Sequence, residues 1–317
     1  MNKERNTVGF NQRYVGFLGL DNSNDPVKFG GGEGVVKLSV AENVNVQRNM
    51  SVSRRDGYSL WKSGQYKSLW GNGVDVYAVK ANGINGDLVK LDSNKVETVI
   101  RSNVVNLPME FVDARNGYIY YTNGLLIGKI KNGVSYSLTN SSDQFKGTLP
   151  PGSFLSYLSP RILVVRDNVI YISDAVNRDV YHQHTGFIQF DTTIRMVAPV
   201  GQNLFVSDSR YTWFLMKMQP QLDIPSPMFQ LKKVASYPAI AGNPFAVVEG
   251  IKTEMGYYAD AAMWISENGV CIGGSDGMFE NLTDKKYKMP SVMRSACVEN
   301  VTVGDLNLFI SVIKGIK

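Results

Sequence analysis

The chain has 317 residues, 44% of them hydrophobic and 19% charged, so it can bury a substantial core as one large all-β domain or two ordinary domains. A net charge of +5 permits contact with nucleic acid but does not indicate a dedicated DNA-binding module. The only cysteines, Cys271 and Cys297, exclude a disulfide framework and a CxxC zinc site, and we expect both to be buried free thiols.

Residues 1–40 are polar and glycine-rich, and they are predicted to form an N-terminal arm or connector that is partly ordered around residues 16–22. This stretch lacks an apolar run of signal-peptide length, and no segment approaches a transmembrane span, so we expect synthesis and folding in a cytoplasm. The glycine run at residues 30–34 lacks the strand, the Lys-Ser/Thr pair and the helix of a phosphate-binding loop. It is therefore interpreted as a connector.

Residues 41–61 are predicted to contain a β-hairpin. The residues alternate at 43–46 and again at 50–53, with Arg48 and Asn49 offering a tight turn between them. A second turn is expected at Asp56-Gly57. The predicted propeller domain, residues 41–317, begins with this hairpin.

From Ser68 onward the sequence repeats a unit of four short apolar stretches with a period of roughly 42 residues, which is typical of propeller blades. Four units open at Ser68, Met109, Gly152 and Ile194. Asn-Gly pairs separate many of the stretches, and such pairs are strong hairpin signals. No segment has a convincing helical period. The pattern predicts an all-β fold, a β-propeller of four-stranded blades.

The period loosens after Ser236. Residues 261–283 predict another strand set, and the proline-containing segment within about 219–260 is interpreted as an insertion on one rim. Residues 295–313 supply two last strands, which leaves a blade half complete. Pairing the N-terminal hairpin with these strands would close the ring. We expect six blades, with five or seven as alternatives.

The acidic residues suggest turns rather than catalysis. Three of them, Asp167, Asp208 and Glu267, align at the turn after the second strand of their units, and a second set aligns at the next turn: Asp92, Asp174 and Asp276. Asp and Asn at turns bind local backbone groups. His182 and His184 lie two apart, without further ligands to complete a metal site. The protein is therefore predicted not to be an enzyme, and we predict no catalytic, cofactor-binding or metal-binding residues.

Two other sets have a functional and a structural interpretation. Arg54 and Arg55 could contact phosphates or the carboxylates of a neighbour, or they could be solvated charges that protect an edge. The four tryptophans are interpreted as packing between blades rather than as a sugar-stacking platform: Trp61, Trp70, Trp213 and Trp264.

Residues 43–58, NVNVQRNMSVSRRDGY, resemble the opening of a group of virion proteins of tailed phages. Three later stretches, residues 149–175, 187–215 and 263–283, are similar to pieces of the same proteins in the same order, so the resemblance covers most of the chain. Asp56 departs from the proline that this group usually has before the glycine, and the turn is unaffected.

The resemblance implies a β-propeller tail component similar to nozzle or tail-hub proteins. Such a subunit would form a homo-oligomeric ring, with a hexamer as one option, below the portal. It would contact portal, adaptor or other tail proteins, touch genomic DNA transiently and without specificity, and belong to the virion tail. The alternative is a receptor- or carbohydrate-binding tail propeller that uses rim aromatics such as Tyr257 and Tyr258. A propeller hydrolase would need acids that converge on the central funnel.

Overall fold

The computed structural model describes residues 59–218, 228–253, 255–284, 293–303 and 306–315, together with shorter stretches at 16–21, 23, 35–39, 44–46, 49–54, 57, 287 and 289. The chain divides into two units, residues 1–59 with 283–289, and residues 60–282 with 290–317. All regular elements in the described residues are β-strands, and no helix long and apolar enough to cross a membrane is found among them.

The larger unit contains five four-stranded antiparallel sheets, which we number in chain order. Their strands are β5 (Tyr66–Gly71), β6 (Val76–Asn82), β7 (Asn85–Leu91) and β8 (Glu97–Val105); β9 (Glu110–Asp113), β10 (Ile119–Thr122), β11 (Ile127–Lys131) and β12 (Val134–Tyr136); β14 (Phe154–Leu158), β15 (Arg161–Arg166), β16 (Val169–Ile172) and β18 (Phe187–Gln189); β19 (Ile194–Val200), β20 (Asn203–Asp208), β21 (Thr212–Lys217) and β22 (Phe229–Ala235); and β23 (Phe245–Lys252), β24 (Tyr257–Ser266), β25 (Gly269–Gly274) and β26 (Phe279–Asn281).

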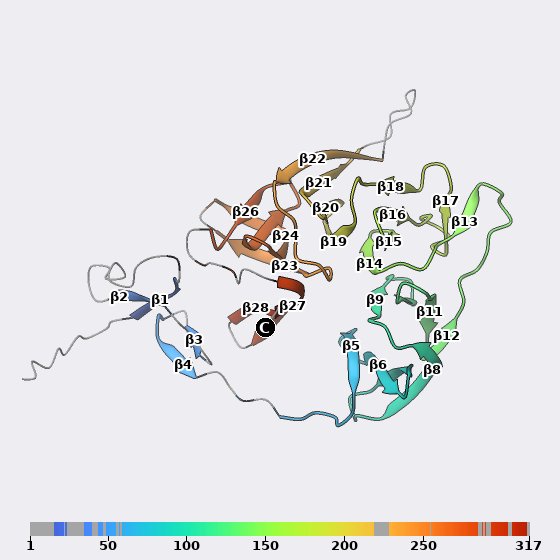
Figure 1. The fold of residues 1–317 in the computed structure, drawn as a ribbon, viewed down its shortest axis with the longest axis horizontal. Coiled ribbons are helices and arrows are strands. Elements are labelled where there is room, and N and C mark those ends of the chain that lie inside the picture. The colour runs from blue at the N-terminus through green and yellow to red at the C-terminus, as the bar shows by residue number, and fades with distance from the viewer. Residues whose placement is uncertain are drawn as a thin grey trace, which may run out of the picture. The chain divides into compact units, whose positions relative to one another are not determined.

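Within this unit the sheets follow one another around a common centre (Figure 1). The first strand of every sheet lines a central cavity, and so does β27 (Met293–Val303), which pairs with β28 (Leu306–Gly315) in a two-stranded hairpin. Strand order follows chain order in each sheet, except that β17 (Val180–His182) lies outside the third sheet. The fold is therefore all-β and propeller-like. Four repeating units of the sequence correspond to the first four sheets, which confirms the predicted strands.

Apolar clusters fill the four interfaces between successive sheets. The first and second sheets share a cluster around Leu88 and Tyr121, and the fourth and fifth share one around Phe205 and Trp264. The other two interfaces have comparable clusters. Backbone hydrogen bonds to side chains add to each junction; for example, the N–H of Met109 donates to Ser68 Oγ over 2.8 Å.

A ribbon of two short strands ties the second sheet to the third. β13 (Lys146–Thr148) pairs with β17, although more than thirty residues separate them. The carboxylate of Asp179, beside β17, accepts hydrogen bonds from Tyr120 Oη over 2.6 Å and from Lys129 Nζ, both in the second sheet. It also accepts one from the N–H of Thr139 over 2.7 Å. We call this group of four residues the Asp179 lock.

The segment that was predicted as a rim insertion contains regular strands. β22 completes the fourth sheet and β23 begins the fifth, while residues 219–227 lie outside the described residues. The prolines and glycines of this stretch do not interrupt its sheets. Pro244 lies just before β23, and Gly250, which has a φ of +65°, lies near the end of β23.

The C-terminal hairpin packs against the fifth sheet through β27. The N–H of Ala296 donates to the carbonyl of Ala241 over 3.0 Å. Gly242 has a φ of +106°, and a Cβ there would lie 2.8 Å from the carbonyl oxygen of Ala296, so only glycine allows this close approach.

The smaller unit contains the predicted hairpin, β3 (Val44–Val46) with β4 (Val52–Arg54), which confirms that element. It also has a parallel pair, β1 (Gly16–Leu20) with β2 (Val35–Leu38). Among the described residues, the β3–β4 and β27–β28 hairpins each form a two-stranded sheet. Six blades, and closure by pairing of the chain ends, therefore stay predictions.

Candidate functional site

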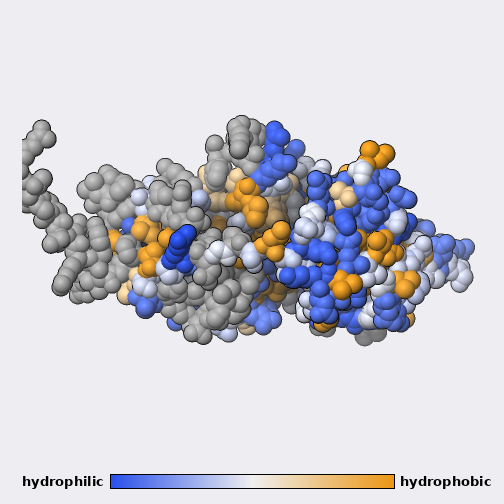
Figure 2. Space-filling view, turned by 90° about the horizontal axis from the view of Figure 1, so that it is seen from below, coloured by the Kyte–Doolittle hydropathy of each residue, from blue (hydrophilic) through white to orange (hydrophobic). Residues whose placement is uncertain are grey.

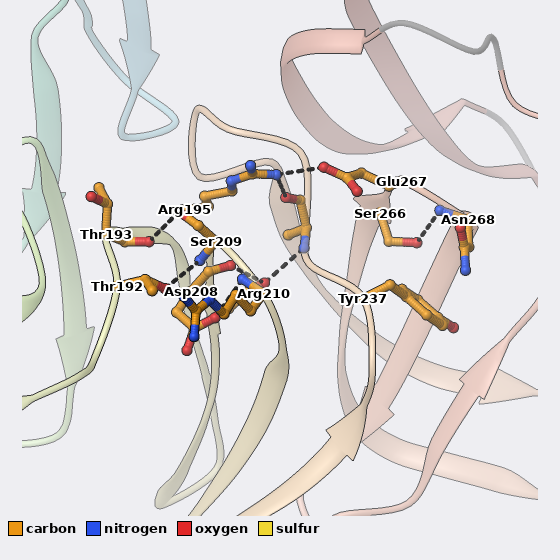
Figure 3. Close-up of polar contacts among 12 residues, drawn as sticks. Thr192, Thr193, Arg195, Asp208, Ser209, Arg210, Tyr237, Ser266, Glu267 and Asn268 are labelled. Carbon is orange, nitrogen blue, oxygen red and sulfur yellow. Dashed lines mark hydrogen bonds and ion pairs between the residues drawn. The ribbon is translucent and has the colours of Figure 1, made fainter.

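The repeat-equivalent acids lie at the turns where the sequence predicts them, and Asp208 and Glu267 of the first set have polar partners there. Asp208 is the last residue of β20. It is buried and accepts hydrogen bonds from the N–H groups of Arg210 and Tyr211 and from Trp213 Nε1. Glu267 forms an ion pair with Arg195 over 2.7 Å, between the fourth and fifth sheets (Figure 3). Asp167 occupies the β15–β16 turn with a φ of +56°. These contacts favour a structural role for the first set of acids.

The second set of turn acids, Asp92, Asp174 and Asp276, also accepts hydrogen bonds from nearby backbone N–H groups. Asp92 accepts from the N–H of Asn94 and Val96, and Asp276 accepts from the N–H of Met278. Asp174 accepts from the N–H groups of Val176 and Asn177. It also pairs with Lys146 Nζ over 2.8 Å, across the ribbon of β13 and β17.

The Lys146 contact, assisted by the two backbone N–H groups, lowers the pKa of Asp174 to about 2. Because the folded pKa lies below the unfolded value of 3.8, the stabilisation is present above pH 4 and disappears as the pH falls toward 2. We expect Asp174→Asn to lower the thermal midpoint slightly at pH 7, because the pair is partly exposed. The thermal midpoints of the two proteins should approach each other as the pH falls from 4 toward 2; a constant difference would contradict this.

The two histidines form a partly exposed aromatic cluster with Phe145. His182 and His184 both pack on Phe145, with ring centroids 6.5 Å and 6.1 Å away. His182 Nδ1 lies 3.1 Å from Thr185 Oγ1. No group of three or more His, Cys, Asp or Glu side chains suited to a metal occurs among the described residues.

Three of the four tryptophans pack between strands as predicted. Trp264 is fully buried between the fourth and fifth sheets, Trp70 stacks on Phe111, and Trp213 donates to Asp208. Trp61 differs, because 43% of it is exposed beside the first sheet. Cys271 is buried as expected, whereas Cys297 on β27 is exposed, which contradicts its predicted burial.

The remaining predicted residues belong to both units. Arg54 is exposed at the end of β4, and Arg55 lies outside the described residues. Tyr257 and Tyr258 begin β24; Tyr257 is exposed, whereas Tyr258 is buried.

The junction between the first sheet and the C-terminal hairpin is unlike the other junctions of the larger unit. No apolar cluster joins them among the described residues, and a cavity of about 640 Å³ lies there instead. Aromatic and aliphatic side chains of the first sheet and its approach line this seam cavity, with Glu299 of β27 opposite: Trp61, Tyr66, Leu69, Trp70 and Leu91.

The hairpin presents an unpacked face and an unpaired edge. In its register Cys297 lies opposite Val312 and Glu299 opposite Ile310, so these four side chains share one face. Val312 is 65% exposed and Ile310 is 45% exposed. β28 pairs only with β27 among the described strands, which leaves its other edge open over ten residues. Long apolar edges of this kind readily accept another strand.

The outermost strands of the larger unit also carry exposed apolar side chains. At least one lies on the outer strand of each of the first four sheets: Val99 and Val105, Val134 and Tyr136, Phe187, and Leu231. On the face shown in Figure 2, apolar side chains lie in small groups among hydrophilic ones. Scattered groups of this size are normal on a protein surface, and the feature that bears on assembly is their recurrence on the outer strands of successive sheets.

The central cavity contains a desolvated acid, Glu110, that no sequence pattern indicates. It measures about 610 Å³, and Glu110, the first residue of β9, lines it together with Glu299. Burial raises the pKa of Glu110 to about 7. In the sequence Glu110 is a single acid at the start of a short strand; six converging strands create its environment.

No protein-family model matches this sequence, and no curated protein matches it. Solved structures that are similar include a protein from Lactobacillus plantarum, with 14% identity, a TM-score of 0.44 and 75% of each chain covered. The WD40 domain of coronin from Toxoplasma gondii has 11% identity and a TM-score of 0.44, over 76% of this chain and 62% of that one. An auxiliary nutrient binding protein from Bacteroides ovatus has 10% identity and a TM-score of 0.44, over 68% and 56%. Scores in this range carry no functional argument.

Proposed function

We propose that the protein is a non-enzymatic structural subunit of a tailed-phage virion, a tail nozzle or hub component that forms a ring below the portal. The resemblance of residues 43–58 and of three later stretches to phage virion proteins supports this assignment. The observation that carries the assembly role is the recurrence of exposed apolar side chains on the outer strands of the first four sheets, as at Val99 and Leu231. The polar groups at the repeated turns, by contrast, are occupied by local contacts.

In this proposal the propeller has six blades and is closed by the N-terminal hairpin. The five complete sheets have four strands each, whereas β27 and β28 are two, so two strands are needed. β3 and β4 are two strands, and in this proposal they supply the missing pair.

Deletion of residues 1–49 tests the closure. We expect this variant to lose the cooperative melting transition of the full chain, because the sixth blade then lacks strands and its apolar seam opens to water. Deletion of residues 1–40 is the matched control, which keeps the β3–β4 hairpin and should melt almost as the full chain does. If the longer deletion keeps the full transition, the hairpin does not close the ring.

The assembled form would be a homo-oligomeric ring, a hexamer being one option, that contacts portal or adaptor proteins and other tail proteins. Outer-strand side chains such as Val99 and Leu231 would provide lateral contacts between subunits. Such head-to-tail contacts form a ring rather than a filament when the rotation between successive subunits brings the last one back to the first. Contact with the passing genome would be transient and independent of base sequence, since the net charge is only +5. The protein would be assembled in the host cytoplasm and reside in the virion tail.

Virions assembled with Leu231→Lys test this role, with the neighbouring exposed substitution Gln230→Lys as control. We expect particles that lack tails or leak DNA from the first variant and normal particles from the second. Normal particles that fail only to adsorb would instead support the receptor- or carbohydrate-binding alternative. The feature that favours this alternative is the aromatic lining of the seam cavity by Trp61, Tyr66 and Trp70.

A further inference from the structure

The central cavity of the larger unit is built from side chains of six strands. β5, β9, β14, β19, β23 and β27 each contribute to its wall. A volume of about 610 Å³ lies within the range of cavities that hold small organic molecules. The cavity is separate from the outer strands that support the assembly role.

The charges in the cavity are mainly acidic. Glu110 and Glu299 line it, and neither carboxylate has a hydrogen bond or ion pair within the part of the chain that the structure describes. Asp113 and Arg115 also line it and lie 4.0 Å apart as an ion pair, so they largely compensate each other. Glu110 is desolvated and has no partner there, which is costly, and a cation would relieve that cost, whereas Glu299 is exposed.

Aromatic side chains surround these acids. Trp70 and Phe111, stacked with centroids 6.0 Å apart, contribute to the wall, as do Tyr157 and Phe245. Faces of aromatic rings attract organic cations. Tyr157 makes one such contact with a residue that does not line the cavity, because the guanidinium of Arg178 lies 5.6 Å from its ring centroid.

The composition of the wall discriminates among ligand classes. Two unpaired carboxylates oppose an anion, and the described residues contain no set of three ligands suited to a metal. An ammonium group with an aliphatic body matches both the carboxylates and the aromatic rings. We propose that the central cavity binds an organic ammonium compound, with Glu110 as the principal counter-ion and Glu299 as the second.

The proposal predicts a characteristic pH dependence. Burial raises the pKa of Glu110 to about 7, so below this pH an ammonium must displace the carboxyl proton in order to bind. Affinity should therefore fall up to tenfold for each pH unit below 7 and level off above it. The charged and titratable groups that share the cavity with Glu110 are Asp113 and Arg115 after β9, Tyr157 of β14, and Cys297 and Glu299 of β27.

Calorimetric titration of the full chain with spermidine, putrescine and tetramethylammonium, at pH 6 and pH 8, tests the proposal. We expect saturable binding that is several-fold to tenfold tighter at pH 8, with proton release at pH 6. Glu110→Gln should weaken binding at least tenfold and remove the pH dependence, and Glu299→Gln should weaken it less. Glu249→Gln, at an exposed acid on β23, is the matched control and should bind as the unmodified chain does.

Circular dichroism melts of each variant verify that the fold is retained. Equal affinity of Glu110→Gln and the unmodified chain would overturn the proposal, and so would absence of saturable binding at millimolar amine. Binding that Glu249→Gln weakens as much as Glu110→Gln would also overturn it, because it would indicate general attraction of polyamines to surface acids.

Discussion

Asp179→Asn is expected to destabilise the protein by about 3 to 5 kcal/mol, the usual cost of removing one partner from a buried ion pair. Asp179 is only 2% exposed, and its carboxylate accepts hydrogen bonds from Tyr120, Lys129 and the N–H of Thr139. The amide would keep the shape of the side chain but leave the Lys129 ammonium, which is 14% exposed, without its counter-charge. Denaturant unfolding at pH 7 measures the loss.

A matched control is the exposed ion pair of Asp113 and Arg115. Asp113 Oδ2 lies 4.0 Å from Arg115 Nε, and the side chains are 39% and 75% exposed, respectively. Asp113→Asn should cost less than about 0.5 kcal/mol, because solvent screens this pair. The double variant Asp179→Asn, Lys129→Met should recover part of the loss, since it removes the uncompensated charge. A loss below about 1 kcal/mol for Asp179→Asn alone would show that the lock contributes little.

The Asp179 lock also predicts how stability responds to acid. Burial alone would raise the pKa of Asp179, but hydrogen bonds from Lys129, Tyr120 and Thr139 outweigh it and lower the pKa below its ordinary value. The lock therefore stabilises the fold at neutral pH and weakens as the pH falls below about 4. The same carboxylate raises the pKa of Tyr120 together with burial, so the phenol stays protonated and continues to donate.

Most strands could be predicted from the sequence because their signals are local. In the first four sheets, short apolar stretches meet at turns such as Asn123-Gly124, where the Asn123 side chain accepts from backbone N–H groups and Gly124 has a φ of +87°. The ribbon of β13 and β17 could not be predicted in this way. Its strands have three residues each, and their pairing depends on contacts distant in sequence.

The sites escaped prediction for a related reason. Asp179 resembles the many turn acids of this chain, and only the fold brings Tyr120 and Lys129 from the second sheet to it. Tyr120 and Lys129 lie in ordinary alternating strand sequences, and no polar motif marks them as partners of Asp179. Cys297 was expected to be buried like Cys271, yet β27 is part of a two-stranded hairpin with no packed neighbour on one face, so the same residue type is exposed there.

Glu110→Gln is expected to stabilise the protein at alkaline pH, in contrast to most substitutions in a protein interior. The pKa of Glu110 is raised by burial from 4.5 to about 7, so folding forces the charged carboxylate into an unfavourable environment above pH 7. Stability of the unmodified chain should therefore decrease as the pH rises from 4.5 to 7, by about 3 kcal/mol at most.

The glutamine variant should lack this decrease, so its advantage should be absent at pH 4 and full at pH 8. Denaturant unfolding at both pH values, without added amine, measures it. Glu299→Gln is the control because it removes a carboxylate from the opposite wall of the same cavity. If both variants change the pH dependence of the unfolding free energy equally, the net charge of the cavity is the cause. If only Glu110→Gln changes it, the cause is the burial of the Glu110 carboxylate. That second result would also mean that a bound ammonium offsets the cost of burying the charged Glu110 carboxylate, a cost already present in the empty cavity. Binding affinity and folding stability would then both report the charge of Glu110.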